Sequence, residues 1–227
     1  MKRSTNFLLV MLLVSSTLAV LPSAASDYTL GIFGNANMDD MIDEDDIAYV
    51  EGIIEGTNER TELADANYDG EVDEDDITQI ELIICGEEKE LTIIDSADRI
   101  VTVNKPINKI IVINSDIVET MRSIKATEEI IGVGKYMIDK KTFFPEFGDY
   151  PNVGKTTAPD CEKILELQPD AVFFYATIWT SQLDEVQNTL ESADPNIKVV
   201  RFDCFKPESY MEEVKKAWLP SWKKRRS

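Results

Sequence analysis

The sequence contains no histidine among its 227 residues, and this absence excludes any site that depends on imidazole. Neither a histidine general base nor a zinc centre with histidine ligands can form. Basic residues are scarce: 23 Lys and Arg against 43 Asp and Glu give a formal net charge of -20 at pH 7. Nucleic-acid binding needs a basic surface, so we exclude it. The hydrophobic share of 43% is nevertheless too high for a disordered acidic chain.

Cysteine and catalytic motifs are also sparse. The chain has three cysteines, Cys85, Cys161 and Cys204, so at least one lies outside any intrachain disulfide. Their wide spacing is not a metal-binding pattern, and we expect ordinary packing cysteines. The sequence carries no Gly-rich phosphate loop and no Gly-x-Ser-x-Gly elbow. We therefore expect a binding protein and not an enzyme.

The first residues have the layout of an export signal. Lys2 and Arg3 precede an apolar run over 7–21, and small residues follow at 23–26. This pattern predicts a secretory signal peptide over residues 1–26. The alternative is an uncleaved membrane anchor, but the run is shorter than the roughly 20 residues that span a bilayer. We expect a secreted, cell-surface or periplasmic protein.

The acidic excess is local. Residues 27–88 contain 21 acidic residues and a single base, Arg60, whereas the remainder of the chain is close to neutral. A block of like charge is usually a solvated tail. The alternative is a site for multivalent cations, and the spacing of the acidic residues distinguishes the two.

The acidic block is a tandem repeat with an offset of thirty residues. Segments 35–46 and 65–76 both place oxygen-bearing side chains at positions 1, 3, 5, 9 and 12 of a twelve-residue loop, with an apolar residue at position 8. Calcium takes six to eight oxygen ligands, which such a loop supplies together with a main-chain carbonyl at position 7. Position 6 favours glycine; Gly70 fits and Asp40 departs. We expect two calcium ions, with the ligands Asn35, Asn37, Asp39, Met41, Asp43 and Asp46 in the first loop and Asp65, Asn67, Asp69, Glu71, Asp73 and Asp76 in the second.

Each loop runs into an apolar helical pattern with no helix before it, and residues 30–87 resemble a dockerin domain. The resemblance implies calcium-dependent folding and docking onto a cohesin module in extracellular complexes. In that family the helix-start residues at loop positions 10 and 11 recognise the partner and are often Ser/Thr. Here they are Glu44-Asp45 and Glu74-Asp75. A cohesin is therefore a candidate partner, with calcium binding the firmer expectation.

The second half alternates short apolar runs with helical patterns, which predicts a parallel sheet with helices on both faces. It opens with a hairpin of 91–95 and 100–103. The expected strands are then 109–113, 130–133, 171–175 and 197–202, and the expected helices are 114–124, 160–167, 181–192 and 207–219. Ser115 or Asp116 is the expected N-cap of the first of these helices.

Ligands of such sheets bind beyond the carboxyl ends of the strands. The corresponding loops are 114–116, 134–137, 154–158, 175–180 and 203–207. They carry aromatic residues and lysines, which suits a bulky, partly anionic ligand. The alternative is that most of them are surface residues at the rim. Asn114 and Ser115 are the first ligand-binding candidates.

Residues 91–219 resemble the periplasmic binding proteins that serve iron-siderophore, haem and vitamin B12 importers. The resemblance rests on the opening hairpin, on IIGVGKY (130–136), on NVGKTTAPDCEKILELQPDAVFFY (152–175) and on IKVVRFD (197–203). It implies an ABC transporter permease as partner and an iron chelate or corrinoid as ligand. The fold expected for the whole chain is an α/β Rossmann-like lobe plus a small all-α dockerin-like calcium-binding domain.

The same resemblance implies roles for four residues. Aromatic ligand contacts of the vitamin B12-binding relatives fall at Tyr136, Thr156 and Tyr175, where Thr156 is not aromatic. A glutamate that pairs with transporter arginines matches Glu162. The alternative for Glu162 is a favourable interaction with its own helix dipole.

We therefore expect four parts: a signal peptide (1–26), a dockerin-like domain (27–88), the N-terminal lobe of a periplasmic binding protein (89–219) and a basic tail (220–227). The family has two lobes and this chain has room for one, so we expect a truncated chain, with a deliberate single-lobe protein as the alternative. Two functions stay open. One is a substrate-binding component of an ABC importer; the other is an extracellular assembly protein linked to polysaccharide degradation.

Overall fold

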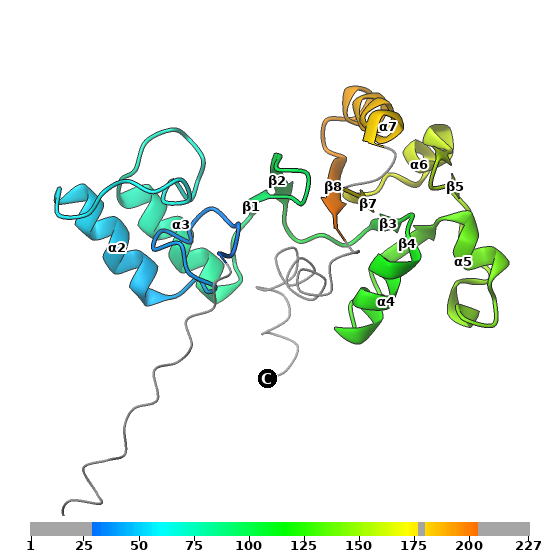
Figure 1. The fold of residues 1–227 in the computed structure, drawn as a ribbon, viewed down its shortest axis with the longest axis horizontal. Helices are drawn as coiled ribbons and strands as arrows, with labels where there is room; N and C mark the ends of the chain where they lie inside the picture. Colours follow the sequence, from blue (N-terminus) through cyan, green and yellow to red (C-terminus); the bar gives the residue numbers. More distant parts are fainter. Residues whose placement is uncertain (1–28, 177–179, 204–227) are drawn as a thin grey trace, which may run out of the picture.

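The computed structural model describes residues 29–176 and 180–203 (Figure 1). The expected signal peptide over 1–26, the helix over 207–219 and the basic tail over 220–227 lie outside these residues. Among the helices that are described, none combines the length and the apolar character that crossing a membrane requires.

The acidic repeat forms two helices, each preceded by a loop. Helix α2 spans Glu44–Ile54 and helix α3 spans Glu74–Cys85. Their N-caps, Asp43 and Asp73, have the same backbone angles, φ -149° and ψ -164°, and both form a capping box with the aspartate three residues on. The sequence repeat is thus a repeat in structure.

The two halves of the repeat are held together by a small core and by cross-loop hydrogen bonds. The fully buried side chains of this core are Ala36, Val50, Ala64, Ala66 and Ile80. The Gly34 N–H donates to the Leu63 carbonyl at 2.7 Å, and the Thr61 hydroxyl donates to the Ala36 carbonyl at 2.7 Å. The two halves of the repeat therefore contact each other directly, through this core and these hydrogen bonds.

The hairpin follows directly. Strand β1 (Glu90–Ile94) pairs antiparallel with strand β2 (Ile100–Asn104). The chain ahead of the first loop also lies along β1: the Phe33 N–H donates to the Thr92 carbonyl at 3.0 Å, and the Ile94 N–H donates to the Gly31 carbonyl at 2.8 Å. The hairpin therefore joins the acidic repeat to the rest of the molecule, which Figure 1 places on its other side.

The four remaining main strands form the predicted parallel sheet, in the order β4-β3-β7-β8. Their bounds are Ile110–Val112 (β3), Ile130–Val133 (β4), Ala171–Tyr175 (β7) and Lys198–Phe202 (β8). The helices that follow them or connect them are Ser115–Ser123 (α4), Cys161–Leu167 (α6) and Thr180–Ala193 (α7). Strands and helices fall where the apolar pattern predicts them.

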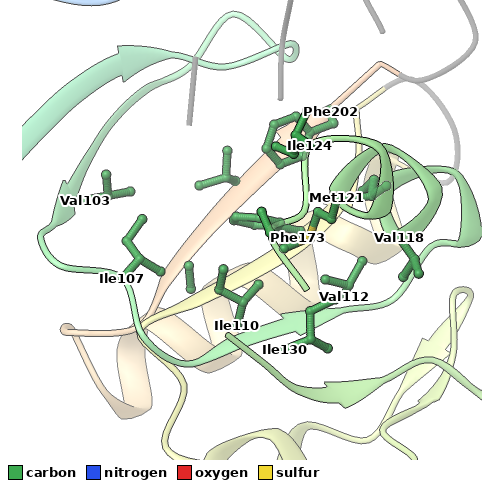
Figure 2. Close-up of a cluster of buried hydrophobic side chains, with 14 of the residues drawn as sticks. Val103, Ile107, Ile110, Val112, Val118, Met121, Ile124, Ile130, Phe173 and Phe202 are labelled. Atoms are coloured by element: carbon green, nitrogen blue, oxygen red, sulfur yellow. The ribbon is translucent and has the colours of Figure 1, made fainter. Parts of the chain in front are cut away.

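Each face of this sheet buries its own apolar cluster, because successive strand side chains point to opposite faces. On one face Phe173 and Phe202, with ring centroids 4.9 Å apart, pack with Met121 of α4 (Figure 2). On the other face Phe174 packs with Leu183 of α7. Helices therefore cover both sides, as expected for an α/β lobe.

The hairpin is fixed to the sheet through buried charge. The Asp95 carboxylate accepts hydrogen bonds from the Arg99 guanidinium and, at 3.1 Å, from the Arg201 N–H on β8. The Ser96 N–H donates in turn to the Arg201 carbonyl at 3.0 Å. Because the Asp95 side chain is fully buried, this contact aligns the hairpin with the edge strand.

Three local expectations need correction. The N-cap of α4 is Asn114, one residue before Ser115 and two before Asp116. Segment 134–137, expected as a loop, largely belongs to helix α5 (Lys135–Asp139). Segment 154–158 holds strand β5 (Gly154–Lys155) and part of strand β6 (Ala158–Pro159), and a short 3-10 helix, η1, spans Pro145–Phe147. All of these elements are too short to give a periodic sequence signal.

The cysteines differ from one another. Cys85 is exposed and Cys161 is half-buried against the second apolar cluster, and neither is in a disulfide. The prediction of a packing cysteine therefore holds for Cys161 and is wrong for Cys85. Cys204 lies outside the described residues.

Candidate functional site

The first candidate site lies at the carboxyl edge of the parallel sheet. Strands β3, β4 and β7 run in the same direction, so their carboxyl ends meet at one edge. Asn114 follows β3, Gly134 follows β4 and Tyr175 ends β7. The fold thus brings Asn114 and Tyr175, which are far apart in the sequence, to the same edge of the sheet.

Gly134 is required at this edge by close backbone approach. A Cβ atom there would lie 2.3 Å from the Ile113 carbonyl oxygen, and the Gly134 N–H donates to the Val112 carbonyl at 3.0 Å. The glycine of the IIGVGKY motif therefore has a packing role of its own, independent of any ligand.

Asn114 is the buried polar group of the edge. Its side chain forms no capping hydrogen bond to α4, and its buried amide oxygen has no hydrogen-bond partner among residues 29–176 and 180–203. Buried polar atoms in folded proteins are nearly always hydrogen-bonded. This acceptor at the end of a central strand is therefore available to a donor that the described residues do not supply.

Tyr175 reaches the same helix. Its ring is buried at the end of β7, and its hydroxyl donates a hydrogen bond to the Asp116 carboxylate. Ser115, which is half-buried, lies between Asn114 and Asp116. The fold therefore places three of the five predicted ligand residues in one group, at the start of α4 and the end of β7.

Tyr136 and Thr156 form a second group at the outer edge. Tyr136 is half exposed on α5, where its ring meets Phe144 edge-on with centroids 6.2 Å apart. Thr156 lies in the turn between β5 and β6, and β5 packs against α5. A parallel bridge between Val133 and Asn152 fastens the segment to β4.

Glu162 stands apart from these groups. It is exposed in the first turn of α6, whose N-cap Asp160 accepts a hydrogen bond from the Lys163 N–H at 3.0 Å. An acidic side chain there also favours the positive end of the helix dipole. Its position suits an outward-facing contact as well as this local role.

The second candidate site consists of the two acidic loops. In each loop a hydrogen bond connects the last residue to the third, because the position-12 carboxylate accepts the main-chain N–H of position 3. Asp46 accepts from Asn37 at 3.1 Å, and Asp76 accepts from Asn67 at 3.2 Å. Position 4 has a left-handed backbone in both loops, at Met38 and Tyr68. The path of the chain is therefore the same in both over this stretch.

Burial perturbs the two closing carboxyls. It raises the pKa of Asp46 to about 6 and raises the pKa of Asp76, although main-chain N–H donors partly oppose the shift in each case. A buried carboxylate of this kind is stabilised by a nearby cation. Both aspartates, however, also complete capping boxes, so helix capping alone accounts for an acceptor at positions 9 and 12.

The loops differ at position 1. In the second loop the Asp65 carboxylate accepts the N–H groups of Asp69 at 3.0 Å and Gly70 at 2.9 Å. In the first loop Asn35 accepts from the Asp39 N–H at 3.1 Å, while its amide group donates to the Leu30 and Asp39 carbonyls at 2.8 and 2.7 Å. One oxygen of the second loop is thus replaced by a donor in the first.

The donor chemistry fits calcium better in the second loop. All of its predicted ligands offer oxygen, and Gly70 adopts the left-handed turn, with φ +102°, that position 6 requires. Across residues 29–176 and 180–203, no three Asp, Glu or Cys side chains are gathered in an arrangement that could hold a metal. Calcium binding is therefore a prediction from donor type and loop path.

One residue of the first site was missed by sequence reasoning. Asp116 was expected only as a helix cap, yet it receives the Tyr175 hydroxyl across 59 positions of sequence. Its place directly after Asn114 and Ser115 is the signal that could have singled it out.

No protein-family model matches the chain, and no curated protein matches it either. Similar solved structures are periplasmic binding proteins. The TroA-like periplasmic binding protein FepB from Veillonella parvula has 20% sequence identity to this chain and a TM-score of 0.49. The match covers 60% of this chain and 43% of the FepB chain. The petrobactin-binding protein YclQ from Bacillus subtilis has 19% identity and a TM-score of 0.46, covering 58% and 45%. The periplasmic heme-binding protein RhuT from Roseiflexus sp. RS-1 has 23% identity and a TM-score of 0.39, covering 52% and 44%. The chain spans less than half the length of each of these structures.

Proposed function

We propose that the chain is an extracytoplasmic substrate-binding component of an ABC importer for an iron complex or a corrinoid. The sequence resemblance over residues 91–219 supports this function, and so does the strand order β4-β3-β7-β8 with its polar carboxyl edge. The ligand lies over Asn114, Ser115 and Tyr175 and extends towards Tyr136 and Thr156.

The observation that carries this proposal is the amide oxygen of Asn114, which is buried at the carboxyl end of β3 and has no hydrogen-bond partner among the described residues. A ligand donor restores the hydrogen bond that the fold leaves open. The exposed ring of Tyr136 offers an apolar surface to a bulky ligand, and Lys155 at the same edge is an exposed cation for an anionic one. The half-buried Lys135 is paired with Asp139 at 2.6 Å.

Binding is tested by titrating the full chain with a ferric siderophore, haem and cyanocobalamin in separate calorimetric experiments. Asn114→Leu keeps the shape of the side chain and removes its oxygen, so affinity should fall about tenfold. Asn196→Leu makes the same change in an exposed turn before β8, at the opposite edge, and should leave affinity unchanged. Equal affinity for both variants would remove Asn114 from the site.

Glu162 is proposed to contact the transporter permease. In a reconstituted transporter, Glu162→Arg should abolish uptake while the ligand affinity measured in solution stays normal. Glu166→Arg, an exposed position one turn further along α6, is the matched control. Uptake by the Glu162 variant at the level of this control would exclude the docking role.

The acidic repeat supports a second function, a calcium-binding, dockerin-like module. The observation that favours it is the shared end of the two loops, where Asp43 and Asp73 have the same backbone angles and form the same capping box at the start of α2 and α3. In the second loop Asp65, Asn67, Asp69, Asp73 and Asp76 would hold the ion with the Glu71 carbonyl. The bound ion supplies the positive charge that offsets repulsion among these carboxylates.

Circular dichroism of the full chain in chelator and in calcium tests this module. Helicity of α2 and α3 should be reduced in chelator and restored with calcium; unchanged helicity would exclude calcium-dependent folding. Recognition of a cohesin is a separate question. The exposed helix-start pairs Glu44-Asp45 and Glu74-Asp75 present negative charge, so a calcium-dependent pull-down should favour a cohesin with a basic face.

A further inference from the structure

Arg60 lies across the second acidic loop. One nitrogen of its guanidinium is 3.3 Å from an Asp65 carboxylate oxygen, and another donates to the Gly70 carbonyl at 3.1 Å. The Asp65 side chain is buried, whereas the Arg60 side chain is half exposed. Arg60 is also the single base among residues 27–88, so its position on a loop ligand is the one place where the acidic repeat neutralises its own charge.

The guanidinium connects position 1 of the loop to position 6. The Asp65 oxygen that it contacts also accepts the Gly70 N–H at 2.9 Å. Arg60 therefore closes the first turn of the loop from outside, with a positive charge placed on the carboxylate that begins the predicted calcium ligand set. An arginine fork suits this task because its donors are planar and fixed relative to one another.

The first loop achieves the same closure without a charge. The residue equivalent to Arg60 is Leu30, and the residue equivalent to Asp65 is Asn35, whose amide group donates to the Leu30 and Asp39 carbonyls. In the first loop the neutral Asn35 provides hydrogen-bond donors from its own amide group. In the second loop the charged Asp65 has no donor of its own, and Arg60 provides the donors and a positive charge.

We propose that Arg60 is an intramolecular cation that substitutes for calcium at the second loop. It stabilises the loop when calcium is scarce, and it lowers the affinity of the loop for calcium by holding one oxygen of the Asp65 carboxylate and by repelling a second positive charge. This proposal rests on the calcium function proposed above. It makes the second loop responsive to calcium concentration over a higher range than its ligand set alone would give.

The test measures calcium affinity by calorimetry and thermal stability in chelator for the full chain. Arg60→Gln should bind calcium about tenfold more tightly at one site and should melt roughly 3 °C lower in chelator. Arg60→Lys keeps the charge without the planar guanidinium, so its calcium affinity and its melting temperature in chelator should lie between those of the wild type and of Arg60→Gln. Lys89→Gln removes the same charge from an exposed position beside the repeat and should match the wild type in both measurements.

The two proposals fail in different ways. Wild-type protein that takes up no calcium would exclude the calcium function and the substitution by Arg60 together. Calcium binding by the wild type, with Arg60→Gln indistinguishable from Lys89→Gln, would exclude the role of Arg60 alone. Lower stability in chelator without tighter calcium binding would reduce Arg60 to a structural ion pair and would also overturn the proposal.

Discussion

The acidic repeat and the α/β part of this chain are held together by different forces. The core of the repeat is small, with three alanines beside Val50 and Ile80, and its loops are ordered by carboxylates that accept main-chain N–H groups. The α/β part buries large apolar side chains on both faces of a sheet. The repeat should therefore respond to ions and to single polar changes, and the sheet to changes of apolar volume.

The largest expected effect is in the sheet. Phe173→Ala removes a buried ring that packs on Phe202, and it should lower the free energy of unfolding by about 3–5 kcal/mol in urea denaturation (Figure 2). Calcium should not restore this loss. Phe143→Ala, at a residue that is 67% exposed, should change stability by less than about 0.5 kcal/mol.

Loss of the contact between the hairpin and the sheet should lower the free energy of unfolding nearly as much as Phe173→Ala does. Asp95→Ala leaves the Arg99 guanidinium and the Arg201 N–H without their shared acceptor, at an expected cost of about 3 kcal/mol. Hydrogen exchange should locate the loss in β1, β2 and β8. If protection falls equally in α2 and α3, the repeat and the sheet unfold as one unit.

Smaller effects should separate capping from metal binding in the repeat. Asp73→Ala removes the N-cap of α3 and should cost about 1 kcal/mol in chelator, whereas Asp73→Ser keeps a capping oxygen and should cost little. Both should weaken calcium binding, as titration calorimetry can measure. Normal calcium affinity in both variants would assign Asp73 to capping alone.

The smallest expected effect on stability comes from giving the first acidic loop the same residue type at position 1 as the second. Asn35→Asp loses the donors to the Leu30 and Asp39 carbonyls, so it should destabilise the calcium-free protein by roughly 1 kcal/mol. In calcium the added carboxylate should compensate for this loss. A melting temperature that is lowered equally in chelator and in calcium would show that the first loop takes no ion.

The elements that could be predicted are those with a strong local pattern. Residues 171–175 form a buried strand because five successive apolar side chains suit a sheet covered on both faces. The repeat was visible because its oxygen spacing occurs twice. Helix α5 was missed because five residues are too few for a helical period, and its start depends on Gly134 approaching the Ile113 carbonyl.

The candidate site was only partly visible in sequence. Asn114 and Tyr175 could be named because both follow apolar runs expected to be parallel strands. That the Asn114 oxygen finds no partner in the described part of the chain, and that Tyr175 donates to Asp116, depends on the packing of α4 against the strand ends. Such pairings cannot be read from spacing, since they join residues distant along the chain.

The sequence by itself determined where the acidic charge lies, where the longer strands and helices form and which loops carry oxygen-bearing side chains, because periodicity and charge are local properties. Only the tertiary structure decided which residues meet. It placed Arg60 on Asp65, gave Asn35 its own carbonyl partners and joined Asp95 to Arg201 on the edge strand. The physical reason is that a contact depends on where the backbone brings two side chains together, whereas a motif states only that each is present.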